Sequence, residues 1–98
     1  MPKKGNINYQ VVYREETTKG LRIKATYHSH FIELIYEMRQ IKSEFLWFGK
    51  IFIDDEVHWE SIESFGCDTH AILDDEIQHK LYTWALMKGY ISHHNIAP

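Results

Sequence analysis

Residues 30–42 read HFIELIYEMRQIK, and this stretch decides which fold we expect. Its apolar residues recur at i, i+3, i+4, i+7 and i+10, which is the spacing of one stripe along an α-helix. Ser29 precedes the stripe and is a residue type that caps helix N-termini. We therefore expect a helix over about 30–42. The residues of the stripe are Phe31, Leu34, Ile35, Met38 and Ile41.

Ile32 and Tyr36 lie beside that stripe and widen the apolar arc of the expected helix to well over half its circumference. A helix packed on a single sheet buries a narrower arc. The surplus indicates a second neighbour, so we expect Ile32 and Tyr36 to contact a partner.

The residues before this stretch predict a β-hairpin. Apolar and polar side chains alternate over 7–14 and again over 21–27, which is the period of a half-buried strand. The polar segment 15–20 between them ends in Gly20 and is typical of a hairpin connection.

The residues after it predict a second hairpin. The strand expected over 45–53 is apolar on both sides, and Asp54 and Asp55 form a tight turn into a strand over 57–62. On the first of these strands one face carries Phe45, Trp47, Ile51 and Ile53, and the other carries Leu46, Phe48 and Phe52.

A further helix is expected over about 74–88, with a start as early as Thr69 possible. Acidic residues 74–76 suit a helix N-terminus, and Gly89 follows where a left-handed residue would end the helix. The apolar stripe of this helix consists of Leu73, Ile77, Leu81 and Trp84.

The expected fold class is α+β in the order ββαββα. The simplest assembly is a four-stranded antiparallel sheet with both helices packed on one face. We expect one domain over 1–98, with residues 1–6 and 92–98 flexible.

Composition places the chain among small soluble domains. Its 98 residues are 44% hydrophobic and 26% charged, which is close to the average for globular proteins. The single cysteine, Cys67, excludes an intrachain disulfide and fits a reducing compartment. No run of 18 apolar residues and no signal peptide is present, so we expect a cytoplasmic protein without membrane contact.

Charge is distributed unevenly along the chain. Residues 1–43 hold eight Lys and Arg against four Asp and Glu, whereas residues 44–98 hold three against ten. A basic first hairpin could follow a phosphate backbone, which makes nucleic-acid binding one alternative function. The competing interpretation is a solvated sheet face on which the cations pair with acids such as Glu60. The candidate nucleic-acid contacts are Arg14, Lys19, Arg22 and Lys24.

Histidines and acids suggest a second alternative, a metal-dependent hydrolase around His28 and His30. Two histidines at i and i+2 are an unspecific pattern, and the spacing of Cys67 and His70 has no second cysteine to support it. The acids at 54–56 and 74–76 are explained by turn chemistry and by helix N-terminal charge. We therefore expect no metal and no cofactor.

The preferred hypothesis is a non-catalytic binding or regulatory protein of the adaptor or inhibitor type. If both helices cover one side of the sheet, Leu46, Phe48 and Phe52 face away from them and require a partner. Two-fold dimers are the commonest form of self-association, so we expect a homodimer or a complex with another protein. The expected partner-binding residues are Ile32, Tyr36, Leu46, Phe48 and Phe52.

Overall fold

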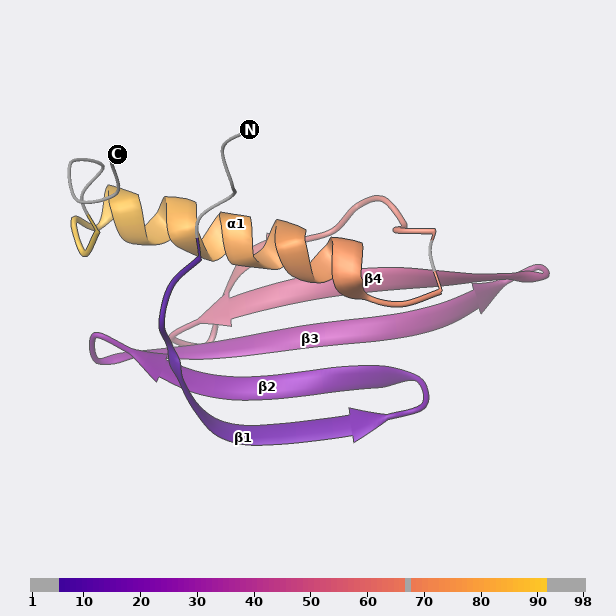
Figure 1. Ribbon diagram of the computed structural model, residues 1–98, viewed down its shortest axis with the longest axis horizontal. Helices are drawn as coiled ribbons and strands as arrows, with labels where there is room; N and C mark the ends of the chain where they lie inside the picture. The colour runs from indigo at the N-terminus through magenta and orange to yellow at the C-terminus, as the bar shows by residue number, and fades with distance from the viewer. Residues whose placement is uncertain (1–5, 67, 92–98) are drawn as a thin grey trace.

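The computed structural model describes residues 6–66 and 68–91 (Figure 1). Its regular elements are five strands followed by one helix. Their bounds are β1 Gln10–Thr17, β2 Gly20–Tyr27, β3 His30–Ile41, β4 Glu44–Ile53, β5 Glu56–Glu60 and α1 Ala71–Met87.

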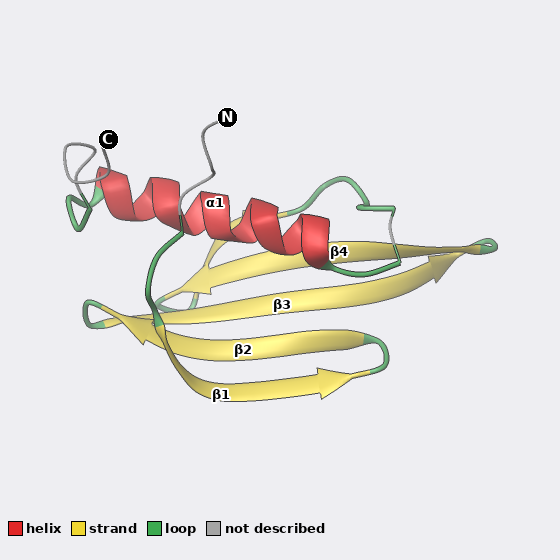
Figure 2. Ribbon diagram, viewed as in Figure 1, coloured by secondary structure: helices red, strands yellow, loops and turns green. Residues whose placement is uncertain are grey.

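The strands form one antiparallel sheet in the order β1-β2-β3-β4-β5, so each strand pairs with its neighbour in the sequence. The helix lies along one face of this sheet (Figure 2). The expectation of four strands and two helices is therefore wrong, although the chain remains a small α+β fold.

The expected helix over 30–42 is strand β3. Ile32, Leu34 and Tyr36 lie beneath α1 and are at most 1% exposed, whereas the intervening side chains point to the other face. This alternation has the period of a strand. Because both faces of β3 carry apolar residues, the same run also satisfies the helical spacing, and pairing with β2 and β4 decides between the two.

Two tight turns lie at the same end of the sheet. His28 and Ser29 both have positive φ angles of 47° and 69°, and Asp54 and Asp55 have 52° and 68°. Paired left-handed residues match the twist of two-residue hairpin turns. Ser29 thus turns the chain between β2 and β3 instead of capping a helix, while the turn expected at Asp54 is confirmed.

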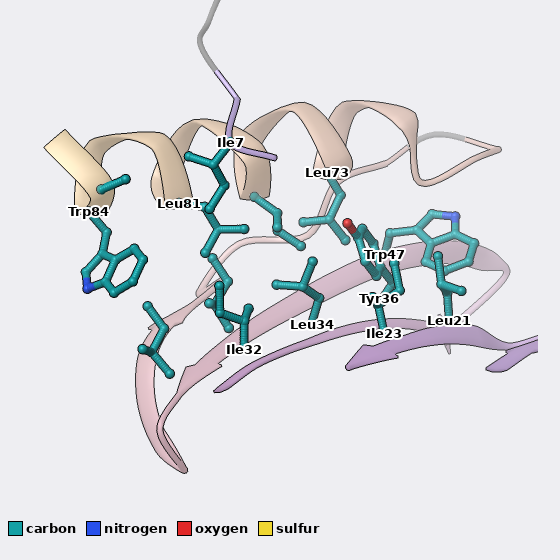
Figure 3. Close-up of a cluster of buried hydrophobic side chains, with 14 residues drawn as sticks. Ile7, Leu21, Ile23, Ile32, Leu34, Tyr36, Trp47, Leu73, Leu81 and Trp84 are labelled. Atoms are coloured by element: carbon teal, nitrogen blue, oxygen red, sulfur yellow. The ribbon is translucent and has the colours of Figure 1, made fainter. Parts of the chain in front are cut away.

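Helix α1 supplies the second half of the core. Its buried residues include the whole predicted stripe and also Ala85. Figure 3 shows Leu73, Leu81 and Trp84 pointing from α1 toward the sheet. Burial of such a side chain contributes about 1.5–3 kcal/mol to folding. Gly89 follows the helix with a φ angle of 80°, as expected for a left-handed terminating residue.

The segment after β5 continues along β4 before the helix begins. The Ser61 amide donates to the carbonyl of Gly49 at 2.9 Å, and Phe65 exchanges two backbone hydrogen bonds with Trp47. No helix within the described residues is long and apolar enough to cross a membrane. The predicted flexible ends lie outside the described residues, except for Asn6.

Candidate binding face

The face of the sheet opposite α1 is the candidate binding face, and we call it the open face (Figure 1). Strand register and burial together identify its members, because alternate residues point to opposite faces. The open face includes Gln10, Tyr13, Glu15, Arg22, Lys24, Thr26, Phe31, Glu33, Ile35, Glu37, Arg39, Ile41, Glu44, Leu46, Phe48, Lys50, Phe52 and Glu60.

Apolar side chains occupy much of this face. Leu46, Phe48 and Phe52 are half-buried and point away from α1, as the alternation of their strand predicts. Phe31 on the neighbouring strand is 59% exposed. The described helix lies on the other side of the sheet. One copy of the chain therefore leaves these side chains partly exposed to water and lacks part of the stabilisation that their burial would provide.

The charged side chains of the open face nearly balance. Arg22 pairs with Glu33 at 3.4 Å, and Lys50 pairs with Glu60 at 3.2 Å. Four basic and five acidic side chains of the strands share the face, so their net charge is −1. They are Arg22, Lys24, Arg39 and Lys50 against Glu15, Glu33, Glu37, Glu44 and Glu60.

Several cations lie over aromatic rings. The Arg39 guanidinium carbon is 4.4 Å from the centre of the Phe48 ring, and the Lys50 ammonium is 5.7 Å from that of Phe52. Such contacts are attractive, and the aliphatic stems of these cations add to the apolar surface. A hollow of about 280 Å³ lies between Arg39, Phe48 and Lys50 and extends to Ile35.

Two of the expected partner-binding residues are not on the open face. Ile32 and Tyr36 belong to the core beneath α1, where they are 0% and 1% exposed. The Tyr36 hydroxyl donates to Oδ1 of Asp74 on α1 at 2.5 Å. Burial, followed by the hydrogen bond and charge of Asp74, raises the pKa of Tyr36 far above its usual value. The hydroxyl therefore stays protonated and donates at all ordinary pH values.

The expected basic hairpin does not form one basic surface. Arg14 points to the α1 side of the sheet, where it pairs with Glu16 at 3.0 Å. Lys19 lies in the turn between β1 and β2. Arg22 and Lys24 are on the open face, but Arg22 pairs with Glu33, whereas Glu60 was the expected acid.

A β-bulge in β1 places Tyr13 on the open face. Register shifts between Val11 and Tyr13, so Tyr13 pairs with Lys24 and points to the open face instead of the core. The Lys24 ammonium lies 5.6 Å from the centre of its ring. This places one more aromatic residue on the open face.

His30 joins three distant parts of the chain at the end of the sheet that carries the two tight turns. Its Nδ1 lies 2.6 Å from Oδ2 of Asp54, and its Nε2 lies 2.7 Å from the Tyr90 hydroxyl oxygen. The hydrogen bond from His30, together with that from the Phe31 amide, lowers the pKa of Asp54. The arrangement connects the β2–β3 turn, the β4–β5 turn and the segment after α1.

A cavity of about 200 Å³ adjoins this cluster and is lined in part by Asp54, Glu56, His58 and Lys88. Burial, with a smaller contribution from Lys80, lowers the pKa of His58, so its imidazole is neutral at pH 7.

The described histidines, His28 to His79, do not assemble into a metal site. Both ring nitrogens of His30 have hydrogen-bond partners, and the His28 ring stacks on Tyr90 at 4.4 Å. Within residues 6–66 and 68–91, no three or more His, Cys, Asp or Glu side chains are placed to hold a metal ion. Cys67 lies outside the described residues.

The acidic clusters have the structural roles expected of turn and helix residues. Asp54 accepts hydrogen bonds from His30 and from the Phe31 amide at the start of β3, and Asp74 accepts one from Tyr36. Glu76 pairs with Lys80 at 3.6 Å, one turn further along α1. These carboxylates are therefore not gathered around one reaction centre.

Sequence reasoning missed the contribution of β3 to the open face, namely Phe31, Glu33, Ile35, Glu37 and Arg39. The alternation of Ile32, Leu34 and Tyr36 with these residues is present in the sequence, but the same run also fits the spacing of a helix. Comparison of the chain with protein-family models, with curated proteins and with solved structures finds no match.

Proposed function

We propose that this chain is a non-catalytic binding protein of the adaptor or inhibitor type, which acts through protein contacts made by its open face and forms a homodimer. The observation that carries the proposal is the half-buried row Leu46, Phe48 and Phe52 on a sheet face opposite the helix. Apolar patches of this kind mark contact surfaces in soluble proteins. The single cysteine is compatible with action in the reducing cytoplasm.

Charge favours a protein partner over nucleic acid. A surface that binds a phosphate backbone presents an excess of cations and releases counterions. The strand side chains of the open face have a net charge of −1, and Arg22 and Lys50 already have carboxylate partners. A polyanion would have to displace these carboxylates, whereas a protein surface with matching charges would not.

The substitution Phe48→Asp tests the proposal. A carboxylate at this position would lose its hydrating water when the second copy binds. We therefore expect dimerisation to weaken by at least about 2 kcal/mol while the domain stays folded. Molar mass by light scattering across a concentration series measures association, and circular dichroism measures folding. The matched control is Ile72→Asp, an apolar residue of α1 that is 59% exposed.

We expect the control Ile72→Asp to associate as the unaltered chain does. The proposal fails if the Phe48→Asp variant associates as strongly as this control. Binding of single-stranded nucleic acid that falls steeply with salt concentration, and that is lost on changing Arg22 and Lys24 to Ala, would favour the nucleic-acid alternative instead.

A further inference from the structure

The cavity beside the His30 cluster lies at the end of the sheet that carries the two tight turns, and we call it the end cavity. It is lined by the β4–β5 turn, by β5 and by the C-terminal end of α1, from which Trp84 and Lys88 contribute. The helical wall places the end cavity on the α1 side of the sheet. A ligand bound here would therefore be independent of contacts through the open face.

Two opposite charges line the end cavity without neutralising each other. Glu56 belongs to β5, and Lys88 follows α1. Within the described part of the chain, neither residue forms an ion pair with the other or with a third residue. By contrast, Lys50 and Lys80 each have a carboxylate partner. The carboxylate of Glu56 and the ammonium of Lys88 are thus available to a ligand.

Trp84 adds a hydrogen-bond donor to the wall of the end cavity. The residue is 7% exposed, and among residues 6–66 and 68–91 its indole N–H has no hydrogen-bond partner. Figure 3 shows the indole nitrogen on the side of the ring that is turned away from Leu81 and Ile32. Because a largely buried donor without a partner is unfavourable, this N–H favours an acceptor atom supplied by a ligand.

Asp54 is the third charged group of the lining, but its oxygens already accept hydrogen bonds from His30 and from the Phe31 amide. These bonds, with a smaller contribution from the charge of Lys88, lower the pKa of Asp54, so it is ionised at neutral pH. The charged lining is therefore two carboxylates and one ammonium. A purely anionic ligand would face the carboxylates, and a purely cationic ligand would face Lys88.

We infer that the end cavity binds a small zwitterion of the amino-acid class, which carries one ammonium and one carboxylate group. The ammonium pairs with Glu56, and the carboxylate accepts hydrogen bonds from the Trp84 indole and from Lys88. Ile53 and Val57 supply apolar lining for the rest of the molecule. The volume of about 200 Å³ is smaller than the roughly 300–1,000 Å³ of pockets for drug-sized ligands, which favours a molecule of few heavy atoms.

Titration of the unaltered chain with each free L-amino acid tests this inference. Two-dimensional NMR resolves the indole N–H groups of the three tryptophans, and sequential assignment identifies that of Trp84. We expect at least one amino acid to shift the Trp84 indole resonance saturably, with a dissociation constant of about 1 mM, because so small a ligand makes few contacts. The indole resonance of Trp47, which does not line the cavity, should stay unchanged.

Substitutions and single-charge probes test the two ionic contacts separately. Glu56→Gln and Lys88→Met each remove the charge of an exposed residue, and each should raise the dissociation constant about tenfold. The matched controls are Glu63→Gln and Lys19→Met, which lie outside the cavity and should leave the constant unchanged. Acetate and methylammonium carry one charge each, so each should bind at least about tenfold more weakly than the amino acid.

The outcomes decide for or against a zwitterion. A saturable Trp84 shift that both Glu56→Gln and Lys88→Met weaken supports the inference. Acetate or methylammonium that binds as tightly as the amino acid overturns it, because one charge is then sufficient. So does the absence of a Trp84 shift with every amino acid up to about 20 mM. The Phe48→Asp variant should bind the amino acid as the unaltered chain does, which separates this site from the proposed function.

Discussion

At the scale of single residues, His30 connects three parts of the chain that are distant in the sequence. Its ring nitrogens form hydrogen bonds with the Asp54 carboxylate and the Tyr90 hydroxyl, and the centre of the Trp84 ring lies 5.1 Å from that of its own ring, edge-on. Hydrogen bonds between groups so far apart in sequence restrict the end of the sheet without requiring an apolar core there. The sequence pattern of two histidines therefore has a structural explanation in His30.

The Asp54→Asn substitution tests this role through its pH dependence. The folded-state pKa of Asp54 is lowered, so its contribution to stability is present above the unfolded value near 4 and is lost as pH falls through the folded value. We expect the variant to melt at a lower temperature at neutral pH, and the difference to shrink as pH falls below about 4.

Thermal unfolding from neutral to acidic pH measures this difference. Asp55→Asn is the control, because Asp55 occupies the same turn but is not a partner of the His30 ring nitrogens. A melting-temperature difference that is constant with pH would show that Asp54 acts through its turn geometry alone.

At the scale of elements, α1 packs closely over Gly49 on β4. A Cβ atom added there would lie 2.8 Å from Cδ1 of Leu73 and 3.1 Å from Cδ1 of Ile77. Both side chains are fully buried, so they have little space to move. The absence of a side chain at this position sets the height of the helix above the sheet.

Gly49→Ala should therefore destabilise the fold by about 1–3 kcal/mol through overpacking. Chemical denaturation gives the free energy of unfolding. The control is Gly66→Ala, where the nearest atom to an added Cβ is 3.8 Å away, an ordinary contact distance. Equal stability of the two variants would mean that α1 does not pack on β4 as described.

The elements that could be predicted from the sequence are those whose apolar residues fit only one periodicity, either that of a helix or that of a strand. The stripe of Leu73, Ile77, Leu81 and Trp84 fits a helix alone, and the alternation in 21–27 fits a strand alone. Residues 30–41 satisfy both periods because Phe31 and Ile35 add apolar side chains to the open face. Only pairing with β2 and β4, which is not local information, selects the strand.

The residues of the open face could be predicted from the sequence only in part. The alternation of 45–53 correctly separated Trp47, Ile51 and Ile53 from Leu46, Phe48 and Phe52. The residues that β3 adds to this face could not be assigned while that segment was read as a helix. The bulge that turns Tyr13 outward has no signal in the sequence pattern.

At the scale of the whole molecule, one face of the sheet is covered by one helix, and the other face carries both acidic and basic side chains among aromatic ones. Self-association through that face would bury side chains that one copy leaves half-exposed. The dimer would then consist of two sheets packed face to face between two outer helices. This two-sheet arrangement follows from the open face and from two-fold symmetry.

The molar mass of the unaltered chain in solution tests this account most directly. Sedimentation or light scattering across a concentration series should show conversion from 11.7 kDa to twice that mass, with no larger species. A mass that stays at 11.7 kDa up to the highest concentration reached would contradict the account.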